Sequence, residues 1–173
     1  MIRAEPAPEW QTTQWFNAPG PLALADLRGK VVLVSAFQML CPSCVSHGLP
    51  QALRVREAFA ASDVAVIGLH TVFEHHDAMA PTSLAAFLHE YRIGFPVGVD
   101  APGQDGMPLT MRAYQMRGTP TTLLIDRAGR LRRHGFGHMP DLQLGAELMA
   151  LVGETGASVA AKTEGGAGRM HLI

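Results

Sequence analysis

Residues 29–44 read GKVVLVSAFQMLCPSC and contain both cysteines of the chain, Cys41 and Cys44. The first part, Gly29–Phe37, includes an apolar run that is rich in β-branched residues and too short for a membrane helix, which predicts a buried central strand. After the cysteines, apolar residues recur at helical spacing, namely Val45, Leu49, Ala52, Leu53, Phe59 and Ala60. The pattern therefore places Cys41 between the end of a strand and the start of a helix.

This placement predicts a reactive first cysteine. Pro42 suits the first turn of the helix, where its missing N–H is not needed. A thiolate at a helix N-terminus faces unpaired backbone N–H groups and the positive end of the helix dipole, so its pKa falls toward neutrality. We therefore predict that Cys41 is the nucleophile and that Cys44, one turn deeper, resolves the mixed disulfide formed at Cys41.

Composition narrows the class of protein. The chain has 173 residues, nearly half of them apolar, and a net charge of −1. These values predict one soluble globular domain and argue against nucleic acid as a partner. No segment approaches the ~20 continuous apolar residues of a membrane helix. The first residues lack the pattern of a secretory signal, so we expect a cytoplasmic protein, or a periplasmic one if a leader has been removed.

The rest of the chain alternates predicted strands and helices. The expected strands are 63–70, 95–99, 118–126 and 131–136, and the expected helices are 82–91, 108–116 and a last one with Asp141 as its N-cap. This order predicts an α/β fold in which helices cover both faces of a mixed central sheet with a parallel core. The catalytic helix would then start at the carboxyl end of a strand, where open α/β sheets place their sites.

Three motifs carry a family resemblance: Gly29-Lys-Val-Val-Leu-Val34, Cys41-Pro-Ser-Cys44 and Gly118-Thr-Pro-Thr-Thr-Leu-Leu-Ile-Asp126. In this order and separation, the chain resembles the thioredoxin-like thiol–disulfide oxidoreductases of the TlpA/ResA type, within the redoxin group. The resemblance implies a thioredoxin-like fold with an inserted helix–strand segment between Thr71 and Pro108. The expected organisation is an N-terminal extension (1–20), the thioredoxin-like domain (21–152) and a C-terminal tail (153–173).

The resemblance also implies a substrate site. Thr119 and Pro120 would be joined by a cis peptide bond across from Cys41, with the Thr119 backbone pairing with an incoming chain and Pro42 beside it. No organic cofactor or metal would be needed. The partners would be a disulfide-containing protein or small thiol substrate and a thioredoxin- or glutathione-type reductant, with the chain acting as a monomer or homodimer. In a reducing cytosol the net direction would be reduction of the substrate.

The sequence departs from the family pattern around the cysteines. Leu40 stands where the family usually has a tryptophan, and Gln38 and Met39 also differ, so we expect altered substrate contact. Ser35 replaces the buried aspartate of thioredoxin proper. His47 stands where many relatives carry a glutamate. Because a histidine titrates near neutral pH, His47 is a candidate for proton transfer, the alternative being an exposed surface histidine.

Two other functions remain open. A peroxiredoxin-like thiol peroxidase would use Cys41, but its Pro-x-x-x-Thr-x-x-Cys signature needs proline and threonine where this chain has Val34 and Gln38. A copper- or zinc-binding thioredoxin-fold module would draw on the loop His70–Asp77, because imidazole and thiolate ligands suit those metals. Against this, a zinc site usually takes four ligands and the chain has no second cysteine pair. His70 ends a predicted strand at the active-site edge, so substrate contact is its other expected role.

Overall fold

The buried strand predicted before the cysteines is β3 (Val31–Phe37), and each of its residues is buried. The computed structural model, which describes residues 4–154, places β3 between a parallel strand, β4 (Val64–His70), and an antiparallel strand, β6 (Thr121–Ile125). The other strands are β1 (Glu5–Pro6), β2 (Thr12–Phe16), β5 (Val97–Asp100) and β7 (Arg130–Phe136). They form one seven-stranded sheet in the order β1-β7-β6-β3-β4-β5-β2. The predicted mixed sheet with a parallel core, β3-β4-β5, is confirmed.

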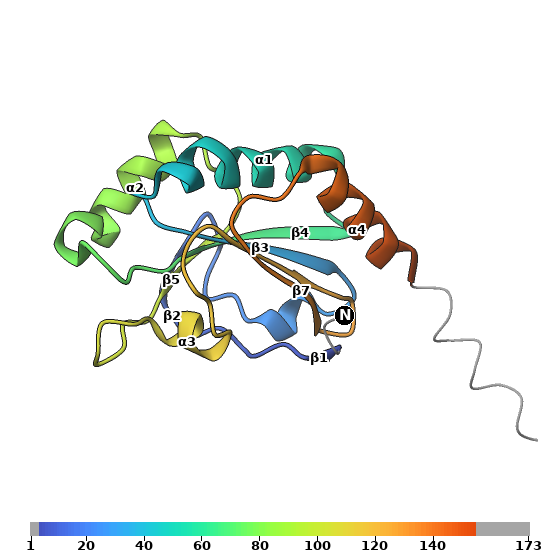
Figure 1. Ribbon diagram of the computed structural model, residues 1–173, viewed down its shortest axis with the longest axis horizontal. Coiled ribbons are helices and arrows are strands. Elements are labelled where there is room, and N and C mark those ends of the chain that lie inside the picture. The colour runs from blue at the N-terminus through green and yellow to red at the C-terminus, as the bar shows by residue number, and fades with distance from the viewer. Residues whose placement is uncertain (1–3, 155–173) are drawn as a thin grey trace, which may run out of the picture.

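Helices lie on both faces of this sheet, as predicted (Figure 1). One face is covered by α1 (Leu49–Ala58), α2 (Pro81–Glu90) and α4 (Asp141–Gly153), and the other by α3 (Leu109–Ala113) and a 3-10 turn, Leu24–Leu27. Val31, Leu33 and Phe37 belong to the core on the first face, and the apolar residues between them belong to the core on the second. Because both faces are covered, β3 is apolar throughout instead of alternating.

The N-terminal segment contributes both edge strands of the sheet. β1 pairs with β7 at one edge, and β2 pairs with β5 at the other. Between them, Trp10 is buried against the second face, its ring near that of Trp15 and its indole N–H donating to the carbonyl oxygen of Leu22. Residues 4–20, expected as an extension, therefore complete the sheet. Most of the expected tail, from residue 155 onward, lies outside the described residues.

Several predicted boundaries differ from the structure: the helix expected over 108–116 is Leu109–Ala113, and the strand expected over 95–99 is Val97–Asp100. Two further differences have a clear structural reason. The strand expected from Gly118 begins at Thr121, because Gly118–Pro120 forms a loop that ends in a cis peptide bond. The N-cap of α4 is Pro140 rather than Asp141, so that prediction was wrong by one residue. The Asp141 carboxylate instead accepts hydrogen bonds from Arg54 and Gln51 on α1, which ties α4 to α1.

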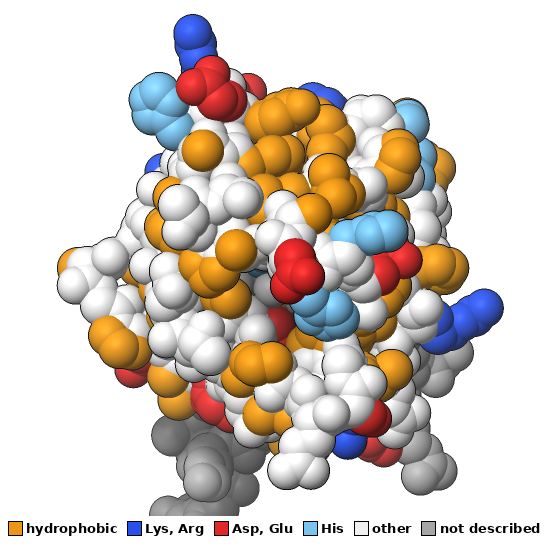
Figure 2. Space-filling view, turned by 90° about the vertical axis from the view of Figure 1, so that its left-hand side faces the viewer, with side chains coloured by type: hydrophobic (Ala, Val, Ile, Leu, Met, Phe, Trp, Pro, Cys, Tyr) orange, Lys and Arg blue, Asp and Glu red, His pale blue; other side chains and the backbone are white. Residues whose placement is uncertain are grey.

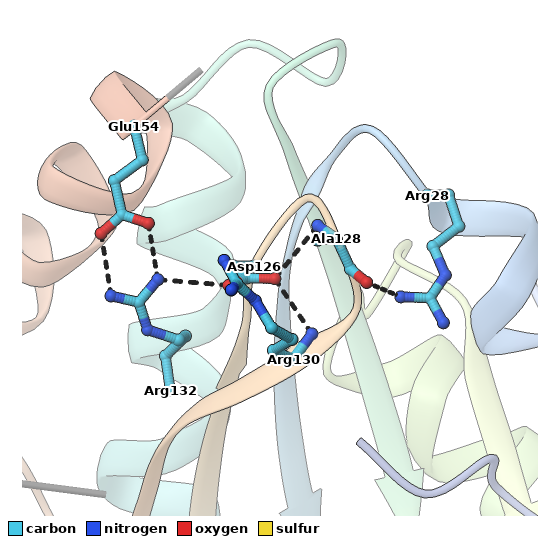
Figure 3. Close-up of polar contacts among 6 residues, drawn as sticks. All are labelled: Arg28, Asp126, Ala128, Arg130, Arg132 and Glu154. Carbon is cyan, nitrogen blue, oxygen red and sulfur yellow. Dashed lines mark hydrogen bonds and ion pairs between the residues drawn. The ribbon is translucent and has the colours of Figure 1, made fainter. Parts of the chain in front are cut away.

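A network of charged groups holds the β6–β7 turn at the end of the sheet where β3 begins (Figure 3). Asp126 is 4 % exposed and accepts hydrogen bonds from the backbone N–H groups of Ala128 and Arg130. Its carboxylate is also paired with the guanidinium groups of Arg130 and Arg132. Arg132 in turn binds Glu154, just beyond α4. This network joins the hairpin to the last helix.

Candidate active site

Cys41 lies where the sequence predicted, between the carboxyl end of β3 and the start of a helix. Pro42 is the first helical residue, and the chain then forms a π-helical turn, Cys44–Gly48, that continues into α1. In the π-helical turn the N–H of Leu49 donates to the carbonyl oxygen of Cys44, five residues back. Pro50, which has no N–H to donate, follows directly, so the irregular turn occurs where proline interrupts the regular α-helical pattern.

Cys41 and Cys44 form a disulfide, with 5.2 Å between their Cα atoms. Cys44 is completely buried, whereas Cys41 is partly exposed. The backbone N–H of Cys44 points at the Cys41 sulfur, with 3.2 Å between N and Sγ. An incoming group can therefore reach Cys41 first, and the helix N-terminus supplies an N–H that can stabilise its thiolate.

The peptide bond between Thr119 and Pro120 is cis, as the family resemblance implied, and it lies next to the disulfide. The Cys41 Sγ is 3.6 Å from the carbonyl oxygen of Thr119. Gly48 packs against Pro120 so closely that a Cβ on this glycine would come within 3.3 Å of the proline Cβ. The carbonyl oxygen of Pro120 accepts a hydrogen bond from Gly137, beyond β7. The loop is therefore held both by the helix that carries the cysteines and by the end of the hairpin.

Two buried polar residues beside the cysteines were not assigned a positioning role from the sequence. The Gln38 side chain accepts a hydrogen bond from the backbone N–H of Phe73 and lies 3.4 Å from Glu74. His70 is 1 % exposed, and its Nε2 accepts a hydrogen bond from the backbone N–H of Met39. Burial lowers the pKa of His70 to about 4, so the ring is neutral at pH 7. The sequence signal for both was polarity in an otherwise apolar environment at the ends of β3 and β4.

His47 is exposed on the π-helical turn. Its Nδ1 is 2.7 Å from the hydroxyl of Ser46, and its ring lies against that of His138, with 4.8 Å between centroids. The structure thus places His47 on the helix that carries the cysteines, at its solvent side. The role of His47 in proton transfer stays a prediction.

Two exposed apolar side chains belong to segments next to the disulfide and the cis loop. Leu40, which precedes Cys41, is 57 % exposed, and Phe136, at the end of β7, is 51 % exposed. The Arg117 guanidinium lies 5.6 Å from the centre of the Phe136 ring, and that ring packs on Gly118. Figure 2 shows the end of the molecule where α1 begins, with hydrophobic side chains gathered in its upper part and acidic and histidine side chains beside them.

The loop proposed as a metal ligand set is used in other ways. Within residues 4–154, no group of three or more histidine, cysteine, aspartate or glutamate side chains is arranged to hold a metal ion. His70 is buried with Nε2 engaged by Met39, and Glu74 faces Gln38. The described part of the chain also contains no helix long and apolar enough to cross a membrane.

Comparison with known proteins agrees with this geometry. The model of the AhpC/TSA family matches residues 4–134, and the chain belongs to that family. A crystal structure of a thioredoxin-like superfamily protein is 66 % identical, with a TM-score of 0.86 over 87 % of this chain and 98 % of the other. A thiol–disulfide isomerase from Corynebacterium glutamicum is 49 % identical, with a TM-score of 0.83 over 86 % of this chain and 97 % of the other.

Curated relatives point the same way. The thiol:disulfide interchange protein DsbE of Pseudomonas fluorescens is 31 % identical over 150 residues, which are 80 % of this chain and 75 % of that protein. The protein DipZ of Mycobacterium tuberculosis is 33 % identical over 127 residues, which are 72 % of this chain but only 17 % of DipZ. The thioredoxin-like fold and the Cys41–Cys44 disulfide together define the class of thiol–disulfide oxidoreductases with a Cys-x-x-Cys site. Thiol–disulfide exchange takes disulfides as substrates, so a disulfide-bearing partner is implied.

Proposed function

We propose that this chain reduces disulfide bonds in proteins or small molecules by a two-cysteine mechanism. The Cys41 thiolate attacks one sulfur of the substrate disulfide, and the other substrate sulfur leaves as a thiolate. Cys44 then loses its proton and attacks the Cys41 sulfur, which releases the second substrate thiolate and leaves the Cys41–Cys44 disulfide. Two electrons from a thioredoxin-type dithiol, or from two molecules of a glutathione-type thiol, would restore the reduced pair. We propose the cytoplasm as its compartment, because thiols are kept reduced there.

The observation that carries this proposal is the unequal exposure of two bonded cysteines beside the cis Thr119–Pro120 loop. A bulky substrate can reach only Cys41. Cys44 is buried, so the sulfur within its reach is that of Cys41. The carbonyl oxygen of Thr119, 3.6 Å from that sulfur, supports the expectation that an incoming chain pairs with this backbone. The exposed apolar side chains of Leu40 and Phe136 support a polypeptide as the preferred substrate.

The test is the equilibrium between the dithiol and the disulfide in defined thiol buffers, measured by trapping free thiols. A single two-electron transition at about −270 mV would support a reductase, whereas one at about −120 mV would assign the chain to oxidation of its partners. Failure of the cysteines to form a reversible disulfide would reject the two-cysteine mechanism altogether. A Cys44→Ala variant is the matched control, because it keeps Cys41 but cannot form the Cys41–Cys44 disulfide.

A further inference from the structure

Cys41 is presented by a short turn, residues 38–41, which joins β3 to the helix. The backbone N–H of Cys41 donates to the carbonyl oxygen of Gln38, with 3.2 Å between N and O. The same turn places the Cys41 sulfur in reach of the Cys44 N–H. The position of the sulfur relative to the helix N-terminus therefore depends on what holds residues 38–40.

The first support of this turn is His70, the last residue of β4. It pairs with Phe37 across the two parallel strands, and its ring packs against the Phe37 ring with 5.2 Å between centroids. Its Nε2 accepts the backbone N–H of Met39 at 3.3 Å, a donor that β3 no longer uses. An accepting Nε2 requires the proton to be on Nδ1, so the neutral ring acts as a fixed acceptor.

The second support is the side chain of Gln38, which is 1 % exposed. Its Oε1 accepts the backbone N–H of Phe73 at 3.2 Å, and its Nε2 lies 3.4 Å from the carboxylate of Glu74. One residue thus closes the turn through its backbone and anchors it to the loop after β4 through its amide. A buried carboxamide whose oxygen and nitrogen both have hydrogen-bond partners is held in one orientation. A methionine of similar length could not make these hydrogen bonds.

We propose that Gln38 and His70 are positioning residues that hold the turn 38–41 so that the Cys41 sulfur meets the helix N-terminus. Neither residue contacts the substrate in this account. They act through Met39 and the backbone of Cys41. The proposal deepens the two-cysteine function and rests on it only in taking Cys41 as the reactive thiol.

The expected consequence is a change in the Cys41 thiolate. When the turn is loosened, the sulfur spends less time near the Cys44 N–H, so the thiolate loses stabilisation and its pKa rises. Loss of one hydrogen bond to the turn corresponds to about a tenfold fall in the thiolate fraction at pH 7. The rate at which reduced Cys41 reacts with a small alkylating reagent should fall accordingly.

The experiment compares the reduced full-length chain with four single variants: Gln38→Met, His70→Leu, His70→Gln and Gln51→Met. Alkylation of Cys41 by iodoacetamide is measured against pH, with the modified cysteine identified by peptide mass spectrometry, and thermal unfolding is recorded for each. Gln51 is the matched control, because it is also a buried glutamine, 4 % exposed, whose amide donates to the carbonyl oxygen of Met139. His70→Gln retains an acceptor that can reach the Met39 N–H.

The proposal predicts that Gln38→Met and His70→Leu raise the Cys41 pKa and slow alkylation at pH 7 about tenfold. Gln51→Met should leave the profile unchanged even where it lowers the unfolding temperature, and His70→Gln should recover part of the rate. The proposal is overturned if Gln38→Met and His70→Leu alter only the unfolding temperature, as the control does. Because alkylation needs no disulfide substrate, a chain that failed as a reductase could still show these shifts, so the two ideas fail separately.

Discussion

Different kinds of interaction stabilise the two ends of the sheet. At the end where β3 begins, the β6–β7 turn is fixed by charged groups around Asp126, with Arg132 and Glu154 extending the network to α4 (Figure 3). At the end where β3 finishes, the turn that carries Cys41 is held by the neutral His70 ring and by the Gln38 amide, whose own partners are the Phe73 N–H and the Glu74 carboxylate.

The difference follows from what each end must do. Ion pairs can supply stability at an end with no reacting group. Fixed carboxylates beside Cys41 would raise the pKa of its thiol and oppose its reactive form. The His70 ring and the Gln38 amide bond to the turn directly, and the Glu74 carboxylate contacts only the far end of the Gln38 side chain. The comparison therefore predicts that reactivity and resistance to unfolding can be changed at separate ends of the molecule.

The largest effect should come from Cys41 itself. Cys41→Ser should lower the rate of disulfide reduction roughly a thousandfold or more, because the nucleophile is lost. The free energy of unfolding of the reduced protein should change little, since the side chain is partly exposed. A coupled assay with a disulfide-bonded protein substrate and excess dithiol measures the rate. A variant that kept more than a tenth of the activity would place the chemistry elsewhere.

The second largest effect is the pH dependence of stability, in which His70 and Asp126 act in different pH ranges. His70 has its pKa lowered by burial from 6.5 to about 4, so the unfolded chain takes up a proton that the folded chain excludes. The contribution of neutral His70 is complete above pH 6.5 and is lost as the pH falls toward about 4, with a total of about 3 kcal/mol. Urea unfolding at several pH values measures it. His70→Leu should flatten this part of the profile, and an unchanged slope would contradict the assignment.

At pH values below about 4, the pH dependence of the unfolding free energy should come mainly from Asp126, at the other end of the sheet. Burial alone would raise the pKa of Asp126, but hydrogen bonds from the Arg130 backbone, Arg132 and the Arg130 side chain outweigh it and lower the pKa. The carboxylate therefore contributes stability above its unfolded pKa of 3.8, and this is lost as the pH falls below that value.

Replacing this carboxylate tests the same end at neutral pH. Asp126→Ala should cost about 2–3 kcal/mol, because it leaves buried backbone donors unpaired. The rate of disulfide reduction below the unfolding temperature should stay within about twofold of the parent, since β3 separates the site from this network. A fall in activity that matched the loss of stability would show that the two ends are coupled. Denaturant unfolding and the coupled assay should be run on the same preparation.

The smallest effects should come from two glycines. A Cβ on Gly118 would lie 2.9 Å from the Phe136 ring, so Gly118→Ala should displace the loop beside Cys41 and cost about 1–2 kcal/mol. Gly145 in α4 has open space around its Cα, and Gly145→Ala should stabilise the protein by about 0.5–1 kcal/mol. Only the first should slow disulfide reduction. Equal effects of the two substitutions on activity would contradict a role for the Gly118–Pro120 loop in the reaction.

The sequence predicted the parts of the molecule that depend on local pattern. The apolar run gave β3, the cysteine spacing gave the disulfide, and the resemblance gave the cis Thr119–Pro120 bond. The sequence predicted that a strand begins at Gly118, whereas β6 begins three residues later, at Thr121. The apolar pattern does not show where a loop takes the place of strand pairing.

What the sequence could not supply was the set of contacts between distant segments. Gln38 meets Phe73, and His70 meets Met39, over separations of more than thirty residues that no periodicity encodes. The placement of β1 and β2 at opposite edges of one sheet also depends on pairing with strands far along the chain. Asp141 was mistaken for a helix cap because its partners, Arg54 and Gln51, lie on α1.

The most direct test of the central claim is to trap the mixed disulfide. Reduced Cys44→Ser protein is mixed with a disulfide-bonded protein substrate, quenched with alkylating reagent and mapped by peptide mass spectrometry. The two-cysteine account predicts a stable adduct linked through Cys41, with none in the Cys41→Ser counterpart. An adduct that forms through Cys44 in the Cys41→Ser protein, or the absence of any Cys41 adduct, would contradict the order of attack that the structure indicates.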